Sequence, residues 1–337
     1  LSMAINPELT AADEISRVLL FPEASKVETF MKGRVELIEY VIRENNFLDG
    51  ISLAELYQNY QIKMLVCAVK RGDEVFIPDG NFVLQKGDRL HIAASRENLR
   101  IFFKKMGQKL SRVKKVLICG GGHVCYYLAN RLIQAKMQVK IIEINRKRCE
   151  ELCELLPEAT IINGDASDQS LLLEEGIHEA DALISLTGMD EENIIISLFA
   201  GAQGVNKIVA KVNEDNRARM VEGLGIDSIV SAKTATADTI LRYVRARKNS
   251  FSSVNVETMY RLLGGKVEAL EFIIKKQSEF VGVPLKNLKL KENNLIACIG
   301  RKRKIIIPNG DTHLEVGDSV IIVTKCRSVN NFKDILK

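Results

Sequence analysis

Two distant segments of this chain carry the same pattern, and this repeat constrains the fold more than any other feature. Residues 35–42, VELIEYVI, alternate apolar and acidic side chains before becoming wholly apolar, and residues 267–274, VEALEFII, do the same. Each copy continues into a Pro-(Asp/Asn)-Gly turn, at 78–80 and 308–310, and then a Gly-Asp pair and a β-rich run. A repeat this long indicates two copies of one domain rather than a solenoid. The turn residues between short alternating strands predict that each copy is a small, β-rich α+β domain.

Between the two copies, apolar runs alternate with helix-like stretches. The predicted strands are 116–119, 139–142, 160–162, 182–186 and 207–212. This alternation specifies a parallel sheet with helices on both faces, which is a Rossmann-type α/β domain. In such sheets ligands bind where the carboxyl ends of the strands meet the following loops. We therefore examine the residues that follow each strand for a binding site.

The first of these strands runs into a glycine turn, Gly120-Gly121-Gly122-His123-Val124. Gly120 and Gly122 fit the first two positions of G-x-G-x-x-G, where one glycine makes the tight turn and the next lets backbone N–H groups approach a phosphate. Glu143 ends the second strand about 20 residues further on, where a carboxylate accepts both ribose hydroxyls and repels a 2′-phosphate. The combination predicts a dinucleotide site that favours NAD over NADP.

The other strand exits supply further polar candidates. Asp165 lies where a loop can flank adenine. Thr187 and Gly188 are placed to contact the second ribose or a phosphate, and Lys211 to neutralise phosphate charge. Each has a structural interpretation as turn or cap chemistry, because strand exits are polar anyway. Asp190, for example, is a candidate cap for the next helix.

The seven cysteines are an odd number spread through apolar runs, which indicates reduced thiols in a cytoplasmic protein. Cys125 stands at the third glycine position of the motif, whose usual role is close helix–strand packing. We therefore expect the helix to be displaced and phosphate binding to be weakened. Cys149 and Cys153 share a helix face, but no neighbouring His or second cysteine pair supports a metal site, so we interpret them as structural.

Composition excludes several classes of function. No apolar run approaches the ~18 residues that a membrane-spanning helix needs. The net charge is +5, but the basic residues are scattered except at 301–304, which resembles a hairpin tip. Aromatic residues make up only 6% of the chain and Trp is absent, so the interleaving of aromatic and basic residues that stacks bases is missing. We predict no nucleic-acid partner.

The repeat also extends upstream of the small domains. Residues 6–15 match residues 231–240, the helix that closes the nucleotide-binding domain. We interpret the start of the chain as the tail of another such domain, or else as a helix that packs onto a partner. The predicted boundaries are 1–24 for the tail helix of a truncated first nucleotide-binding domain, 25–106 for the first small domain, 112–250 for the Rossmann-type domain and 251–337 for the second small domain.

This arrangement resembles the regulator of potassium conductance (RCK/KTN) family, in particular its TrkA branch, the peripheral NAD-binding subunits of bacterial Trk potassium-uptake systems. The resemblance covers nearly the whole chain. Its carriers are residues 120–124, Glu143, 163–166, 187–193 and the repeated Pro-(Asp/Asn)-Gly…Gly-Asp units, which match the RCK C-terminal (TrkA-C) domain.

The resemblance implies a non-enzymatic, homo-oligomeric gating ring, a dimer or a tetramer. It implies a cytoplasmic location at the inner face of the plasma membrane, bound to a potassium-translocating subunit of the TrkH/TrkG type. The implied ligand is NAD(H), or ATP/ADP. The implied nucleotide contacts are Gly120, Gly121, Gly122, His123, Val124, Glu143, Asp165, Thr187, Gly188 and Lys211.

Two other functions remain open from the sequence. The same binding domain serves NAD-dependent oxidoreductases, but these need a substrate pocket with an acid or base, and we find no His–Asp or Tyr–Lys constellation. We therefore predict no catalytic residues and no metal ligands. A nucleotide-independent dimerisation scaffold is the third class, because of Cys125. In any of these classes, a surface such as 267–274 is a candidate for contact between chains.

Overall fold

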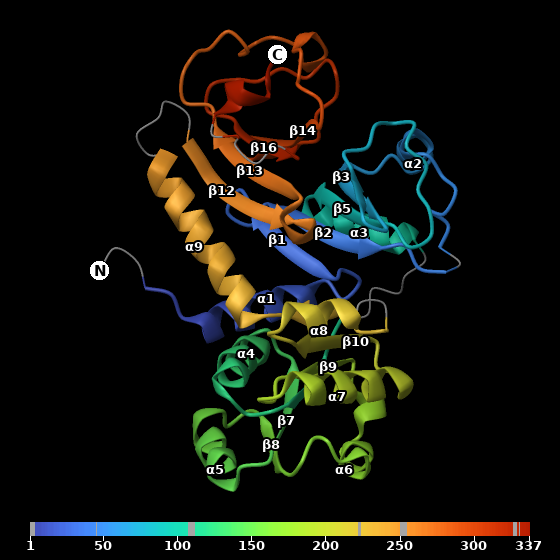
Figure 1. Ribbon diagram of the computed structural model, residues 1–337, viewed down its shortest axis with the longest axis vertical. Coiled ribbons are helices and arrows are strands. Elements are labelled where there is room, and N and C mark those ends of the chain that lie inside the picture. Colours follow the sequence, from blue (N-terminus) through green and yellow to red (C-terminus); the bar gives the residue numbers. More distant parts are fainter. Residues whose placement is uncertain are drawn as a thin grey trace. The chain divides into compact units, whose positions relative to one another are not determined.

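The computed structural model describes residues 4–44, 46–106, 112–221, 224–249, 255–325, 329 and 331–337. The chain divides into two compact units (Figure 1). The parallel-sheet unit consists of residues 1–25 and 111–237, and the repeat unit of residues 26–110 and 238–337. Among the cysteines, Cys326 lies outside the described residues.

The parallel-sheet unit contains a six-stranded sheet in the order β11-β10-β9-β6-β7-β8. Its strands are β6 (Lys115–Cys119), β7 (Gln138–Glu143), β8 (Thr160–Asn163), β9 (Ala182–Ser185), β10 (Lys207–Lys211) and β11 (Ser228–Val230). All neighbouring pairs are parallel. The five predicted strands are confirmed, and the short edge strand β11 was not predicted. Because the chain runs outward from β6 through β8 and then returns to β9, the strand order reverses between β6 and β9.

Helices cover both faces of this sheet (Figure 1). They are α1 (Pro7–Leu20), α4 (His123–Gln134), α5 (Arg146–Leu155), α6 (Gln169–Glu174) and α7 (Asp190–Ala202), with the 3-10 turn η1 (Ile177–Glu179). The short α8 (Asp215–Met220) follows β10, and the long α9 (Ala232–Asn249) follows β11, its residues from Asp238 on belonging to the repeat unit. Successive strand residues point to opposite faces. Ile118 accordingly packs with α1, α4 and α5, whereas Leu117 packs with α6 and α7. The predicted α/β class with helices on both faces is confirmed.

Helix α1 is part of the core of this unit. It begins at Pro7, and the side chain of Asn6 accepts a hydrogen bond from the Leu9 N–H at 2.9 Å, which caps the helix. Its residues Ile15 and Leu19 are buried in the cluster that α4 also contributes to. The residues that match them in the sequence repeat, Ile240 and Val244 of α9, are exposed.

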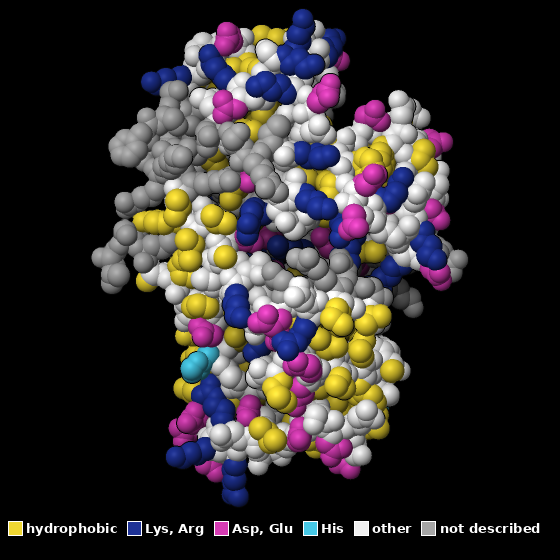
Figure 2. Space-filling view, viewed as in Figure 1, with side chains coloured by type: hydrophobic (Ala, Val, Ile, Leu, Met, Phe, Trp, Pro, Cys, Tyr) yellow, Lys and Arg dark blue, Asp and Glu magenta, His cyan; other side chains and the backbone are white. Residues whose placement is uncertain are grey.

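Figure 2 shows hydrophobic side chains gathered on the surface of this unit around α7 and α8. Ile195 of α7 and Met220 of α8 are among the exposed apolar residues. Within the described part of the chain, no helix is both long enough and apolar enough to span a membrane.

The repeat unit confirms the duplication strand by strand. The first copy has the strands β1 (Lys26–Phe30), β2 (Val35–Val41), β3 (Met64–Arg71), β4 (Glu74–Phe76) and β5 (Arg89–Ala94), and the helices α2 (Leu53–Tyr60) and α3 (Arg96–Lys105). The second has β12 (Asn255–Leu262), β13 (Val267–Ile273), β14 (Asn294–Arg301), β15 (Lys304–Ile306) and β16 (Ser319–Thr324), and the 3-10 turns η2 (Leu263–Gly265), η3 (Leu285–Asn287) and η4 (Phe332–Ile335). The two strand orders, β1-β2-β5-β3-β4 and β12-β13-β16-β14-β15, are equivalent.

The duplication extends to details of the two antiparallel sheets. Both copies have a bulge at the same place, between Val66 and Ala68 in β3 and between Ile296 and Cys298 in β14. The Asp of each Gly-Asp pair is buried and receives a bidentate arginine: Arg71 bonds Asp88 at 2.7 and 2.8 Å. Arg301 bonds Asp318 at 2.9 Å through both nitrogens. The Gly-Asp pair that marks the repeat in the sequence therefore supplies the carboxylate of an ion pair in each copy.

The two copies pack against each other around one shared apolar cluster. Leu37 and Ala93 contribute to it from the first copy, and Ala269 and Val323 from the second. Strand β13 is buried from Val267 to Phe272. The expectation that 267–274 forms a surface between chains is therefore wrong, because these residues lie inside the repeat unit.

Candidate nucleotide-binding site

The three glycines after β6 meet different constraints. Gly120 has φ of +104°, and a Cβ there would lie 2.9 Å from backbone atoms of Leu186 and Thr187. A Cβ on Gly121 would lie 2.7 Å from Leu152 and 3.0 Å from Glu143. Around Gly122, in contrast, no described atom lies within 4 Å of that position. Backbone packing thus requires glycine at 120, whereas the close neighbours of Gly121 are side-chain atoms and Gly122 leaves open space.

That open space lies at the N-terminus of α4. Gly122 is the N-cap residue and supplies no side-chain hydrogen bond to the helix. The first N–H groups of a helix lack partners within the helix, and its dipole favours an anion there. His123 and Val124 follow as its first two residues, with His123 exposed. The turn therefore leaves open space beside N–H groups that favour an anion, and phosphate binding there stays a prediction.

Glu143, at the end of β7, lies directly against the glycine turn. One carboxylate oxygen accepts the Gly121 N–H at 2.6 Å, and the other accepts the Asn145 N–H at 2.7 Å. Arg148 of α5 donates from Nε to the Gly121 carbonyl at 2.8 Å. The structure thus brings together the two motifs that the sequence places 20 or so residues apart. Sequence reasoning missed Arg148, whose position on α5 gives no signal of this contact.

Cys125 is fully buried on the sheet-facing side of α4, in the cluster that includes Ile118 and Leu128. Burial raises the pKa of its thiol well above the ordinary value. Helix α4 starts at His123, immediately after the glycine turn. Cysteine therefore occupies the packing position that the motif assigns to a small residue, as a neutral apolar group. Whether it weakens phosphate binding stays a prediction.

Asp165, after β8, organises its own turn. Its Oδ1 accepts the Ser167 N–H at 2.8 Å and the Ser167 hydroxyl at 2.7 Å, and these bonds lower the pKa of the carboxyl. Asn163 connects this exit to the preceding one, because its amide donates to the carbonyls of Glu143 and Ile144. The exposed side chain of Ile144 beside Glu143 is an apolar surface that sequence reasoning did not consider.

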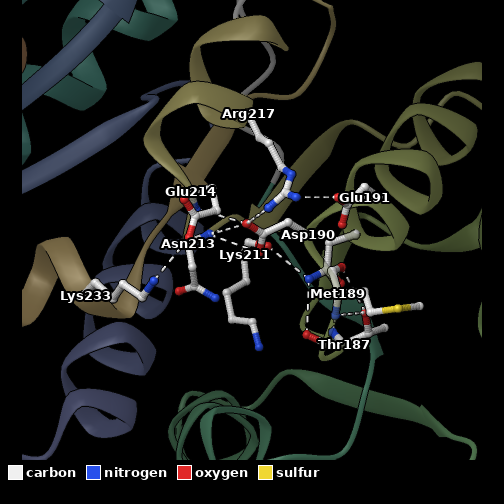
Figure 3. A network of polar contacts seen from close by, with 10 residues as sticks. Thr187, Met189, Asp190, Glu191, Lys211, Asn213, Glu214, Arg217 and Lys233 are labelled. Carbon is white, nitrogen blue, oxygen red and sulfur yellow. Dashed lines mark hydrogen bonds and ion pairs between the residues drawn. The ribbon is translucent and has the colours of Figure 1, made fainter.

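Thr187, Gly188 and Lys211 lie at the exits of β9 and β10 (Figure 3). The hydroxyl of Thr187 accepts the Met189 N–H at 3.3 Å, while no described atom lies within 4 Å of a Cβ on Gly188. The Lys211 ammonium donates to the Leu186 carbonyl at 3.3 Å. Burial lowers the pKa of Lys211, and the nearby Asp190 carboxylate opposes this shift.

Asp190 supports the neighbouring segment rather than a ligand. It lies in the first turn of α7, and its buried carboxylate accepts the N–H groups of Asn213 and Glu214, each at 3.0 Å (Figure 3). Arg217 approaches the same carboxylate at 3.7 Å. The interpretation of Asp190 as the cap of the next helix is wrong, because the N-cap residue of α7 is Met189 and the Asp190 carboxylate bonds the segment that leads into α8.

The candidates from four strand exits therefore form one continuous edge of the sheet. The Leu186 N–H bonds the Cys119 carbonyl at 2.7 Å, Gly121 bonds Glu143, and Lys211 bonds Leu186. This edge contains the switch in strand order between β6 and β9, where open α/β sheets bind their ligands. Asp165 lies at the far end, where the preceding residues Asn163 and Gly164 both donate to the Glu143 carbonyl.

A Rossmann-type sheet with this glycine turn, joined to a pair of duplicated β-rich domains, defines a protein of the RCK class. The structure resembles the crystal structure of the GsuK RCK domain, with a TM-score of 0.53 at 18% identity over 94% of this chain and 66% of that one. It matches the GsuK channel bound to NAD equally well, at 17% identity over 94% of this chain and 55% of that one. At this identity the likeness shows the fold alone.

Family models specify the relationship further. The TrkA-N domain model matches residues 116–232, and the TrkA-C domain model matches 37–107 and 269–337. The chain is 30% identical over 336 residues to Trk system potassium uptake protein TrkA homolog 1 of Methanosarcina mazei, covering 99% of this chain and 73% of the relative. It is 29% identical to the TrkA of Haemophilus influenzae over 322 residues, which is 94% of this chain and 69% of that one. The chain belongs to the TrkA family.

Proposed function

We propose that this protein is a nucleotide-sensing regulatory subunit of a potassium-uptake system. In this proposal it acts as a homo-oligomer at the cytoplasmic face of the membrane and gates a potassium-translocating subunit of the TrkH/TrkG type. The family supports the role, since its relatives carry the name Trk system potassium uptake protein. The GsuK channel, which shares the fold, has been solved bound to NAD.

The observation that carries the nucleotide part is the contact between Glu143 and the glycine turn. Each carboxylate oxygen of Glu143 accepts one backbone N–H and has a further lone pair for a ribose hydroxyl. The open position at Gly122 and the N-terminus of α4 lie beside it for the phosphates. NAD(H) is the proposed ligand, and ATP or ADP would use the same ribose and phosphate contacts.

Regulation requires that the ligand bind one arrangement of the domains better than another. Only such a difference in affinity shifts the population of the two arrangements. The dinucleotide is in this view a ligand and not a redox substrate. An absorbance change when NADH-loaded protein meets candidate substrates would contradict that view.

The test is calorimetry of NADH, NAD, ATP and ADP with the wild-type protein and Glu143→Ala. A hydrogen-bonded carboxylate contributes about 1.5–3 kcal/mol, so we expect the variant to bind roughly 10- to 100-fold more weakly. Glu150→Ala is the matched control, because Glu150 is an exposed glutamate of α5 that pairs with Arg146. Unchanged nucleotide affinity in Glu143→Ala, together with unchanged potassium uptake in cells that carry it, would overturn the proposal.

A further inference from the structure

Asn193 is a fully buried residue of α7 whose side-chain amide binds the exits of two strands. Its Oδ1 accepts the Thr187 N–H at 2.8 Å. Its Nδ2 donates to the Thr187 carbonyl at 3.2 Å and to the Lys211 carbonyl at 3.0 Å. One amide thus fixes the backbone of two of the candidate ligand contacts, at the ends of β9 and β10.

The backbone of Asn193 is also bonded to the sheet. The hydroxyl of Ser185 donates to the main-chain carbonyl of Asn193 at 2.9 Å, and the Ser197 hydroxyl lies 2.9 Å from the Ser185 hydroxyl. All three residues are buried. A buried polar network with its bonds satisfied is rigid, because breaking any member leaves a polar group unpaired in a low dielectric. The backbone at Thr187 and Lys211 is therefore held in a fixed position.

The start of α7 does not require this amide. The N-cap residue of the helix is Met189, and the three bonds of the Asn193 side chain all go to strand exits outside the helix. Asp190, three residues earlier on the same helix, holds Asn213 and Glu214 in a similar way. Two buried side chains of α7 thus define the backbone on this side of the site.

This side is distinct from the one that the glycine turn forms. Because strand order reverses between β6 and β9, a dinucleotide lies across the switch, with one half over each set of strands. Gly122 and Glu143 belong to β6 and β7, whereas Thr187 and Lys211 belong to β9 and β10. The Asn193 amide bonds only the second set.

We propose that Asn193 is a positioning residue that makes the site selective for a dinucleotide over a mononucleotide. It does so by fixing Thr187 and Lys211 for the second half of the ligand, while the glycine turn and Glu143 hold the adenosine half without its help. The inference rests on the proposed nucleotide-sensing function and names the part of the site that recognises the second nucleotide.

The experiment measures the affinities of NADH and AMP for the wild-type protein and Asn193→Ala by calorimetry. We expect NADH binding to weaken by about 10-fold or more, because NADH must then order Thr187 and Lys211 itself, which costs conformational entropy on binding. AMP binding should change by less than about 3-fold. A merely structural role would move both affinities together. Glu191→Gln is the matched control, since this exposed neighbour on α7 bonds Arg217, and it should leave both affinities unchanged.

Asn193→Ala could fail to fold, so the test also uses a second variant and a measurement on the wild-type protein. Asn193→Asp keeps the side-chain volume and the acceptor for the Thr187 N–H, but it turns an oxygen toward the two carbonyls, so it should also weaken NADH selectively. Hydrogen exchange of the Thr187 amide in the wild-type protein should slow with NADH and not with AMP. Equal slowing by both nucleotides would overturn the inference.

The outcomes separate the two proposals. If the wild-type protein binds NADH and AMP, but Asn193→Ala weakens both equally or neither, the positioning role is wrong and the sensing function stands. If the wild-type protein binds neither nucleotide, the sensing function fails and the inference fails with it.

Discussion

Gly120 and Gly122 lie two residues apart in one turn, but their backbone conformations and surroundings differ. The backbone of Gly120 lies in the left-handed region, and the chain at Leu186 and Thr187 approaches it too closely for a side chain. Gly122 has an ordinary φ of −65° and open space around it. Gly120 is therefore required by the fold, and we predict that Gly122 serves the ligand, although both belong to one motif.

Substitution by alanine should separate these roles. Gly120→Ala forces a Cβ against backbone atoms at positive φ, so we expect a loss of stability of about 1–3 kcal/mol. Gly122→Ala should keep the stability within about 0.5 kcal/mol and weaken nucleotide binding, because its methyl group enters the space left for the phosphate. Denaturant unfolding and NADH titration measure the two effects. A stable Gly120→Ala protein, or a Gly122→Ala protein with wild-type affinity, would contradict this division.

The site residues divide by how much the sequence could reveal of them. Gly120, Gly122 and Glu143 were predictable because their spacing follows from the geometry of a strand, a turn and a helix. Asn193 and Arg148 were not assigned roles, because their partners are backbone groups on elements distant in the sequence. The sequence shows that a side chain can form hydrogen bonds, but the group that it bonds depends on how the chain packs.

Strands β5 and β16 are equivalent in the two copies, but one position differs in chemistry. His91 in β5 matches Ile321 in β16, and both are buried. Burial lowers the pKa of His91 to about 4, with Glu39 opposing the shift and Lys26 and Arg89 adding to it. Nε2 of the imidazole lies 3.8 Å from a Glu39 carboxylate oxygen. The second copy shows that the fold accepts an apolar residue here.

The repeat unit should therefore lose stability on acidification. The pKa of His91 is below its ordinary value of 6.5, so the unfolded chain binds the extra proton between pH 6.5 and about 4. This contribution is complete above pH 6.5 and is lost as the pH falls toward 4, by about 3 kcal/mol at 1.36 kcal/mol per unit. His91→Ile should remove that dependence, as measured by denaturant unfolding between pH 4.5 and 7.5. The exposed His178→Asn is the control, and equal pH profiles for His91→Ile and the wild type would refute the assignment.

At the level of elements, apolar runs predicted five of the six parallel strands correctly. They missed β11, whose three residues are too short for a periodic signal. The prediction that 267–274 is a surface for contact between chains is also wrong, because the strand is buried within the repeat unit. Glu271 is buried on the face that the other copy of the repeat covers. Glu268 is buried on the opposite face, which it shares with Leu270 and Phe272 of the second copy's own apolar cluster. Pattern alone cannot show which polar face a partner domain covers.

In the molecule as a whole, the repeat unit is a single body made of two copies. One apolar cluster includes residues of both copies, beside a second cluster within the second copy, and polar contacts cross between the copies. One carboxylate oxygen of Glu271 accepts the Met31 N–H from the first copy at 3.2 Å, and the other accepts the Ser319 hydroxyl at 2.6 Å. Tyr260 of β12 donates its hydroxyl to the Thr29 carbonyl at 3.0 Å. The copies should therefore unfold together.

Glu271→Ala tests this cooperativity. The substitution leaves the Met31 N–H and the Ser319 hydroxyl buried without their acceptor, at a cost of about 1–3 kcal/mol for each. Because β2, β5, β13 and β16 all contribute to the cluster between the copies, hydrogen exchange should accelerate in β2 and β5 of the first copy as much as in β13 and β16 of the second. Glu257→Ala, at an exposed position of β12, should change stability by less than about 0.5 kcal/mol. Faster exchange confined to the second copy would show that each copy is stable alone, and the duplicated domains would then be free to separate when a nucleotide changes their arrangement.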